Sequence, residues 1–409
     1  MPFPCLARSG RLLLSLIAAL SVPAALDAGD WTNWRGPNHD GISAETDIRV
    51  SWSESPRVLW EREVGSAFSA VTGAGERVYT CGTRGGKQVL LCLDATKGDE
   101  VWASDIEKEL EERQGGDGTR ATPAVHGGKV WVLGAHGRLL CADAATGREV
   151  WSRTFGNKPS WAYSGSVLIE GDLAVVSPGE EDGALLALDK DTGLEVWKAG
   201  DDEAGYATPY PFTFEGERYI AGFLAERLLV VAAKSGEEVW STKWKTSYDV
   251  NAATPIFHDG RLFISSGYGT GAALFRLEKK GAKLDAETVW RSKVIRSKFQ
   301  TCILWGGHLY GADESSLKCV DFLTGRELWS ERRVEGRSTQ HGTVAMAGGH
   351  IFFLTGDGWL FAAKASPEGF RPTASARPLR GRCWTVPTIH EGRLFVRSLD
   401  TVVCLDLRK

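Results

Sequence analysis

The feature that most constrains the fold is a repeat of about 45 residues that runs through the chain. One position of the repeat is a tryptophan that ends a short phrase, clearest as Asp-Ala-Ala-Thr-Gly-Arg-Glu-Val-Trp over 143–151. This position is held by Trp60, Trp102, Trp151, Trp197, Trp240, Trp290 and Trp329. A second marker, a glycine followed by an alternating apolar run, starts at Gly75, Gly128, Gly171, Gly216, Gly260, Gly307, Gly349 and Gly392. The chain is therefore predicted to be an array of eight similar units.

Each unit has the pattern of four short strands. In the clearest unit they are expected at 121–125, 129–133, 138–142 and 149–153, with glycine-containing turns between them. Apolar and polar residues that alternate over four to six positions between such turns are the sequence signal of a strand. Four strands in each 40–50 residues is typical of a propeller blade. The predicted fold is all-β: an eight-bladed β-propeller of four-stranded antiparallel blades.

The ends of the chain predict how the ring closes. The eighth unit stops at 405–407 after three strands, whereas 58–62 reads as a fourth strand that no first three precede. We therefore expect the N-terminal strand to complete the last blade, which removes an exposed sheet edge. The alternative is seven blades and one degenerate unit, because 367–378 replaces the usual turn phrase of the seventh unit. The seven repeat tryptophans are expected to fill the wedges between neighbouring blades.

The N-terminus reads as a secretory signal peptide. Arg8 and Arg11 precede an apolar stretch at 12–20, and small residues follow up to Ala28. The apolar stretch is shorter than the roughly 20 residues that span a bilayer. The expected organisation is a signal peptide at 1–28, a lead-in segment at 29–56 and the propeller at 57–409. We expect a periplasmic or secreted protein without a membrane span; an uncleaved anchor is the alternative.

Charge and cysteine content limit the partners and cofactors. The net charge is −4, from 48 basic and 52 acidic residues, so bulk charge indicates no nucleic-acid partner. No two cysteines are three residues apart, and no metal site is predicted. Cys81 and Cys92 fall on adjacent strands of one hairpin, which leaves a disulfide between them open in an exported chain. We expect a monomer.

The candidate binding residues are expected at the mouth of the central channel, because the innermost strands of a propeller face its axis. Counting back from each repeat glycine places ten polar or aromatic residues there: Arg120, Trp161, Tyr163, Tyr206, Asn251, Lys298, Gln300, His341, Arg382 and Trp384. Arginine binds carboxylates bidentately and aromatic rings offer stacking faces. The set predicts a site for an acidic or planar ligand or an acidic peptide. The alternative is a set of polar residues lining a wet channel.

The repeat phrase Ala/Leu-Asp-x-x-Thr-Gly-x-x-x-Trp and the segment Trp-Thr-Asn-Trp-Arg-Gly-Pro-Asn-His-Asp-Gly at 31–41 resemble pyrroloquinoline-quinone-like (PQQ-like) propeller repeat proteins. The resemblance covers nearly the whole chain after the leader. Such repeats occur in quinoprotein dehydrogenases and in BamB-like assembly factors of the outer membrane, which are eight-bladed and non-enzymatic. A quinoprotein would carry calcium beside the quinone, held by Glu and Asn side chains, with an Asp base, and several have two adjacent cysteines.

The chain has no adjacent cysteines and offers no recognisable Glu/Asn/Asp set of the quinoprotein kind. It also lacks the His-Glu-x-x-His and Gly-x-Ser-x-Gly motifs. We therefore expect no catalytic residues and no cofactor, and a BamB-like scaffold that binds an envelope protein or peptide. The alternatives are a PQQ-dependent oxidoreductase and a carbohydrate-binding propeller that uses Trp161, Tyr163 and Trp384.

Overall fold

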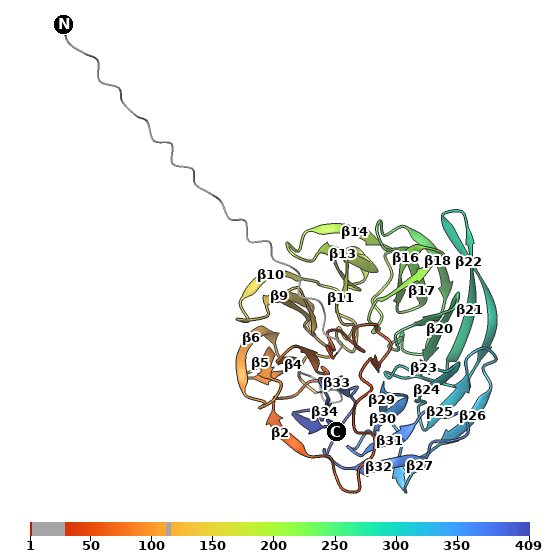
Figure 1. The fold of residues 1–409 in the computed structure, drawn as a ribbon. Helices are drawn as coiled ribbons and strands as arrows, with labels where there is room; N and C mark the ends of the chain where they lie inside the picture. The colour runs from red at the N-terminus through yellow and green to blue at the C-terminus, as the bar shows by residue number, and fades with distance from the viewer. Residues whose placement is uncertain (2–28, 112–115) are drawn as a thin grey trace.

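A computed structural model describes Met1, residues 29–111 and residues 116–409. The described residues form eight blades in a ring, each with four antiparallel strands, and blade seven carries one further, parallel strand (Figure 1). The predicted eight-bladed propeller is confirmed, and the alternative with a degenerate unit is wrong. The predicted signal peptide lies outside the described residues apart from Met1. None of the described helices is long and apolar enough to cross a membrane.

The strands follow one another outward from the axis within each blade. Blade one comprises β3 (Thr72–Ala74), β4 (Arg77–Arg84), β5 (Lys87–Asp94) and β6 (Glu100–Lys108), and blade two comprises β7 (Ala124–His126), β8 (Lys129–Leu133), β9 (Arg138–Asp143) and β10 (Glu149–Thr154). Blade three comprises β11 (Leu168–Glu170), β12 (Leu173–Val176), β13 (Leu185–Asp189) and β14 (Glu195–Ala199), and blade four comprises β15 (Tyr210–Phe214), β16 (Glu217–Phe223), β17 (Arg227–Ala232) and β18 (Glu238–Lys243). A 3-10 helix, η1 (Glu180–Asp182), lies in the turn between β12 and β13.

The remaining blades follow the same order. Blade five comprises β19 (Ile256–His258), β20 (Arg261–Ser266), β21 (Gly271–Lys280) and β22 (Lys283–Ser292), and blade six comprises β23 (Ile303–Trp305), β24 (His308–Ala312), β25 (Leu317–Asp321) and β26 (Glu327–Glu331). Blade seven contains β29 (Thr343–Ala347), β30 (His350–Leu354), β31 (Leu360–Lys364) and β32 (Pro372–Ala376), and blade eight comprises β33 (Thr388–His390), β34 (Arg393–Arg397), β35 (Thr401–Asp406) and β2 (Val58–Glu63). A small hairpin, β27 (Arg333–Val334) and β28 (Arg337–Ser338), joins blades six and seven.

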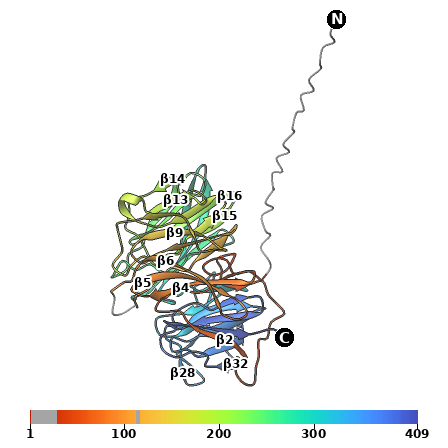
Figure 2. The same ribbon diagram turned by 90° about the vertical axis from the view of Figure 1, so that its left-hand side faces the viewer.

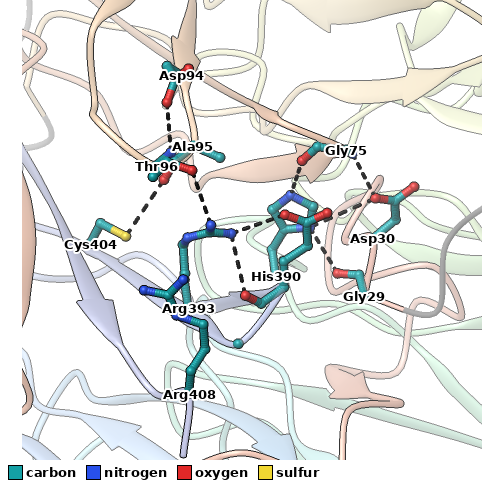
Figure 3. Close-up of polar contacts among 12 residues, drawn as sticks. Gly29, Asp30, Gly75, Asp94, Ala95, Thr96, His390, Arg393, Cys404 and Arg408 are labelled. Carbon is teal, nitrogen blue, oxygen red and sulfur yellow. Dashed lines mark hydrogen bonds and ion pairs between the residues drawn. The ribbon is translucent and has the colours of Figure 1, made fainter.

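The ring closes as the sequence predicted. Strand β2 pairs antiparallel with β35, with Trp60 opposite Cys404, so the N-terminal strand is the outer strand of blade eight. On the inner side of the same seam the ring nitrogens of His390 lie 2.9 Å from the Gly29 carbonyl oxygen and 2.8 Å from the Gly75 carbonyl oxygen (Figure 3). Both ends of the chain therefore hold blade eight to blade one.

The repeat tryptophans lie between blades. The indole N–H of Trp102 donates to the Ala144 carbonyl of the next blade at 3.1 Å, and its ring packs on Gly147. A Cβ on Gly147 would lie 2.5 Å from that ring, and the residue has a φ of +72°, so the turn phrase needs glycine there. The equivalent indole bonds run from Trp60 to Ala95, Trp151 to Lys190, Trp197 to Ala233, Trp290 to Phe322 and Trp329 to Ser366. Trp240 instead packs edge-on against Phe275.

Hydroxyl side chains link the beginnings of the inner strands. In each link a backbone N–H of one blade donates to a Ser or Thr hydroxyl of the next: Ala70 to Thr122, Thr122 to Ser166, Ser166 to Thr208 and Thr254 to Thr301, at 2.9–3.0 Å. These bonds satisfy buried backbone donors that no ladder partner could reach. They hold the inner strands at the same level along the channel axis, so the residues just before each strand gather around that axis.

The two cysteines considered for a disulfide are both free thiols. Cys81 lies opposite Leu90 and Cys92 lies opposite Tyr79, so the register of the β4–β5 hairpin separates them by two pairs. Neighbouring strands bring only directly opposed residues within disulfide range.

Candidate binding site at the mouth of the central channel

A cavity of about 290 Å³ lies on the axis, at the face where each outer strand leads into the inner strand of the next blade. Its lining is mainly aromatic: Trp34, Phe68, Trp161, Tyr206, Tyr268, Phe299 and Trp384. The cations Arg120 and Lys298 complete the polar part of the wall with the hydroxyls of Ser164, Ser166 and Thr208. A concave apolar site with a few convergent polar groups is the usual form of a binding pocket.

Five of the ten predicted site residues line this cavity: Arg120, Trp161, Tyr206, Lys298 and Trp384. Two more, His341 and Arg382, lie against Trp384. The His341 ring centroid is 4.8 Å from that of Trp384, and the Arg382 guanidinium is 4.8 Å from the indole centroid. The indole also stacks between Phe68 and Phe299, at 5.5 and 5.0 Å. Trp384 is thus the centre of an aromatic cluster at the rim.

The other three predicted residues are structural and do not line the cavity. Tyr163 is buried between blades two and three, and its hydroxyl donates to the Pro178 carbonyl at 2.9 Å. Asn251 is fully buried, with its amide nitrogen 2.8 Å from the Leu224 carbonyl oxygen and its amide oxygen accepting from Ser266. Gln300 is 3% exposed. Counting residues locates the ends of the inner strands, but the twist of each loop decides which side chains face the axis.

Four aromatic residues of the site were not among the sequence predictions. Phe68 and Phe299 lie just before inner strands, so a count that included apolar residues would have found them. Tyr268 comes from the β20–β21 turn, and Trp34 from the lead-in segment. The only sequence signal for Trp34 is its place in the Trp-Thr-Asn-Trp-Arg phrase.

Trp34 reaches the cavity because the lead-in crosses the centre of the ring (Figure 1). Its indole N–H donates to Thr254 in blade five at 3.1 Å. The next residue, Arg35, is 1% exposed and donates to the carbonyls of Thr301 and Cys302 in blade six, at 3.0 and 2.7 Å. Burial lowers the pKa of Arg35 to about 10, so it stays charged at neutral pH.

The lead-in then pairs with two more blades. Strand β1 (Ile42–Ser43) runs parallel to β29, which makes blade seven five-stranded. Ile48 forms a bridge with Arg408 near the C-terminus. In the side view the lead-in and the C-terminus lie at the same face of the ring (Figure 2). The lead-in therefore forms the floor of the cavity, and the channel mouth is its open side.

The cavity is electropositive. Burial, and then the charges of Lys298 and Arg382, lower the pKa of His341, so the imidazole is neutral at pH 7. The Lys298 ammonium lies 5.0 Å from the Tyr268 ring centroid. Among the described residues that line the cavity there is no Asp or Glu.

These residues do not fit a quinone held on calcium. Calcium needs six to eight oxygen ligands, and carboxylates supply most of its charge balance. The described lining offers none, and the described part of the chain contains no group of three or more His, Cys, Asp or Glu able to hold a metal ion. The amide groups of Asn251 are already bonded within the protein.

Acid is expected to destabilise the lead-in through His39. This residue is 9% exposed, and burial lowers the pKa of its imidazole from 6.5 to about 4. The unfolded chain therefore binds a proton between those pH values that the folded protein does not. Above pH 6.5 His39 causes no loss of stability. As the pH drops towards 4, the free energy of unfolding falls by up to about 3 kcal/mol. Urea unfolding of the wild type at a series of pH values would measure this loss.

The matched variant is His39→Asn, because asparagine tolerates the left-handed backbone at this position, where φ is +58°. His39→Asn should flatten the pH dependence between 6.5 and 4, because it removes the buried imidazole. Parallel curves for the wild type and His39→Asn would contradict the assignment.

Comparison with known proteins identifies similar sequences and folds. The family model described as outer membrane protein assembly factor BamB matches residues 86–331 and 313–406. The outer membrane protein assembly factor BamB of Burkholderia pseudomallei (strain K96243) is 24% identical over 349 residues, which cover 81% of this chain and 85% of that protein.

Solved structures of two kinds share the fold. BamB from Moraxella catarrhalis matches with a TM-score of 0.62 and 17% identity, over 86% of this chain and 98% of that one. A europium-containing methanol dehydrogenase matches with a TM-score of 0.68 and 12% identity, over 91% and 90%. At these identities the likeness shows the propeller fold, which both kinds of protein use.

Proposed function

We propose, from the premise that this chain belongs to the family of the outer membrane protein assembly factor BamB, that it is a non-catalytic scaffold of the cell envelope. It is exported by its signal peptide and binds a partner protein at the channel mouth. The observation that carries the proposal is the aromatic cavity, which presents Trp161 and Trp384 beside cations on a rigid ring. Exposed aromatic and arginine side chains beside a pocket are the usual anchors of protein interfaces.

A binding role suits the chemistry of the site better than a catalytic one. The described lining has cations, hydroxyls and aromatic rings, but no carboxylate that could act as a base beside a quinone. The buried thiols are poor nucleophiles, because burial raises the pKa of Cys81 and Cys302 to about 11. We therefore propose that the protein works without a cofactor.

The carbohydrate alternative loses one of its three residues. Trp161 is 37% exposed and Trp384 lines the cavity, but Tyr163 is 2% exposed and belongs to the core. The two remaining rings lie beside the cations Arg120, Lys298 and Arg382. This combination suits an anionic protein segment better than a neutral sugar.

The test compares three forms of residues 29–409 as immobilised bait in an envelope extract. The wild type and Trp305→Ala, which truncates an exposed ring at the opposite face, should capture the same component of the outer-membrane assembly machinery. Trp161→Ala should retain at least about tenfold less of it, because a central aromatic anchor contributes at least about 1.4 kcal/mol. Equal capture by all three forms, or no capture by the wild type, would contradict the proposal.

A second measurement addresses the oxidoreductase alternative. Added PQQ and calcium should leave the melting temperature unchanged, and the mixture should not reduce a dye in the presence of alcohols or sugars. A rise in melting temperature together with dye reduction would refute the non-catalytic function.

A further inference from the structure

One side of the channel-mouth face is strongly basic. Three segments on this face, 291–298, 332–337 and 377–382, precede the inner strands of blades six, seven and eight. Together they contain ten Lys and Arg residues and one Glu. We call these three segments the basic crescent, because their blades are consecutive in the ring (Figure 1).

Aromatic rings hold many of these cations in place. Among the described residues, five of the six cation–π contacts involve the crescent: Arg291 over Trp244, Lys298 over Tyr268, Arg337 and Arg377 over Trp359, and Arg382 over Trp384, at 4.1–5.5 Å. A ring orients a cation through its quadrupole but carries no net charge. These rings therefore order the cations without adding a negative charge of their own.

Carboxylates neutralise only part of the crescent. Arg296 is bonded to Asp313 at 2.8 Å and lies 3.3 Å from Glu314, and Arg377 lies 3.5 Å from Asp357. The exposed Arg332 and Arg333 form no ion pair with any residue that the structure describes, although Arg333 donates to the Gly336 carbonyl. Net positive charge therefore remains in the crescent at Arg332 and Arg333.

The opposite side of the same face is acidic. Glu180 and Glu181 in η1, and Asp201 and Glu203 in the β14–β15 loop, are exposed. They belong to blades three and four, across the ring from blades seven and eight (Figure 1). A broad anionic surface such as a membrane would contact both sides and be repelled by the second. A narrow chain can follow the crescent alone.

We propose that the basic crescent binds an extended acidic segment of the partner protein, with one aromatic side chain of that segment inserted into the cavity. The carboxylates of the segment pair with exposed cations such as Arg332 and Arg333, which form no ion pair with a described residue, and its ring joins the Phe68, Phe299 and Trp384 cluster. This inference rests on the proposed function and adds which side of the face binds and what chemistry it recognises. Charge pairing at such a surface is weakened by salt.

The probe is a fluorescent synthetic peptide of alternating Glu and Ser with one central Phe, titrated by anisotropy. Two control peptides carry Gln for every Glu, or Ala for the Phe. The wild type should bind the acidic peptide at least about tenfold more tightly than either control, and high salt should weaken the binding. Equal binding of the Glu and Gln peptides would overturn the proposal.

The protein variants are matched in charge. Arg332→Glu with Arg333→Glu reverses two exposed cations of the crescent, and Arg148→Glu with Arg326→Glu makes the same charge change at exposed turns of the opposite face. The crescent double variant should bind at least about tenfold more weakly, and the control double variant should match the wild type. Unchanged binding by the crescent variant would overturn the proposal. So would binding of the wild type to anionic phospholipid vesicles that the crescent variant loses, since the partner would then be a membrane.

The two proposals fail separately. If the crescent variant captures the envelope partner as well as the wild type does, and Trp161→Ala does not, the scaffold function stands and the acidic-segment inference fails. If no form captures a partner, the scaffold function itself fails.

Discussion

Replacing Arg397 with methionine is expected to lower the free energy of unfolding by at least about 3 kcal/mol. Arg397 is 1% exposed at the end of β34, and its guanidinium crosses the closing seam of the ring. It donates to the Ser69 and Cys81 carbonyls of blade one at 3.0 and 2.5 Å, and to the Gly65 carbonyl at 3.0 Å. Methionine fills much of the same space but leaves these buried acceptors without donors, at about 1–3 kcal/mol for each.

Burial lowers the pKa of Arg397 to about 10, so the group remains charged in any neutral buffer. Urea unfolding of Arg397→Met measures the loss. The stability of Arg397→Lys should lie between those of the wild type and Arg397→Met, because an ammonium keeps the charge but cannot reach as many acceptors. The control is Arg408→Ala, which removes an exposed pair with Asp406 and should cost less than about 1 kcal/mol. If Arg397→Met were no less stable than Arg408→Ala, the seam would not depend on this arginine.

Truncating one blade-docking tryptophan is expected to have an effect of similar size. Trp102→Ala should lower the free energy of unfolding by about 3–5 kcal/mol. The substitution removes a 9% exposed ring from the wedge between blades one and two, and with it the indole bond to Ala144 and the packing on Gly147. The cavity cannot collapse, because the two blades that border it are held by their own sheets.

The matched control is Trp305→Ala, the same chemical change at a ring that is 41% exposed. It should change stability by no more than about 0.5 kcal/mol, as is usual for surface substitutions. Denaturant unfolding of both variants gives the comparison directly. Equal losses from the two substitutions would mean that Trp102 does not dock the blades.

The local pattern predicted the fold because every blade repeats the same local interactions. The turn phrase ending at Trp151 combines an Asp that accepts turn N–H groups, a left-handed glycine and a tryptophan for the wedge, and each element acts within its own unit or the next. The unpaired strand at 58–62 likewise predicted the closure that β2 and β35 make. The resemblance to PQQ-like, BamB-like propellers is confirmed by the family match.

The same reasoning located only part of the site. Trp161, Lys298 and Trp384 line the cavity as expected, whereas Tyr163 and Asn251 are core residues with internal hydrogen bonds. All of them lie close to the start of an inner strand, so their sequence positions are equivalent. The direction of each side chain depends on how its loop bends over the neighbouring blade. No local sequence pattern predicts that bend.

The sequence by itself determined the period, the four-stranded unit and the strand that closes the ring, because these follow from interactions between neighbouring segments. It favoured eight blades over seven, and the structure decided the number. Only the tertiary structure decided that Trp34 forms part of the cavity floor and that the crescent and the acidic side share one face. Those features join residues from opposite ends of the chain or opposite sides of the ring. Their proximity is set by ring closure, which brings together segments that share no local signal.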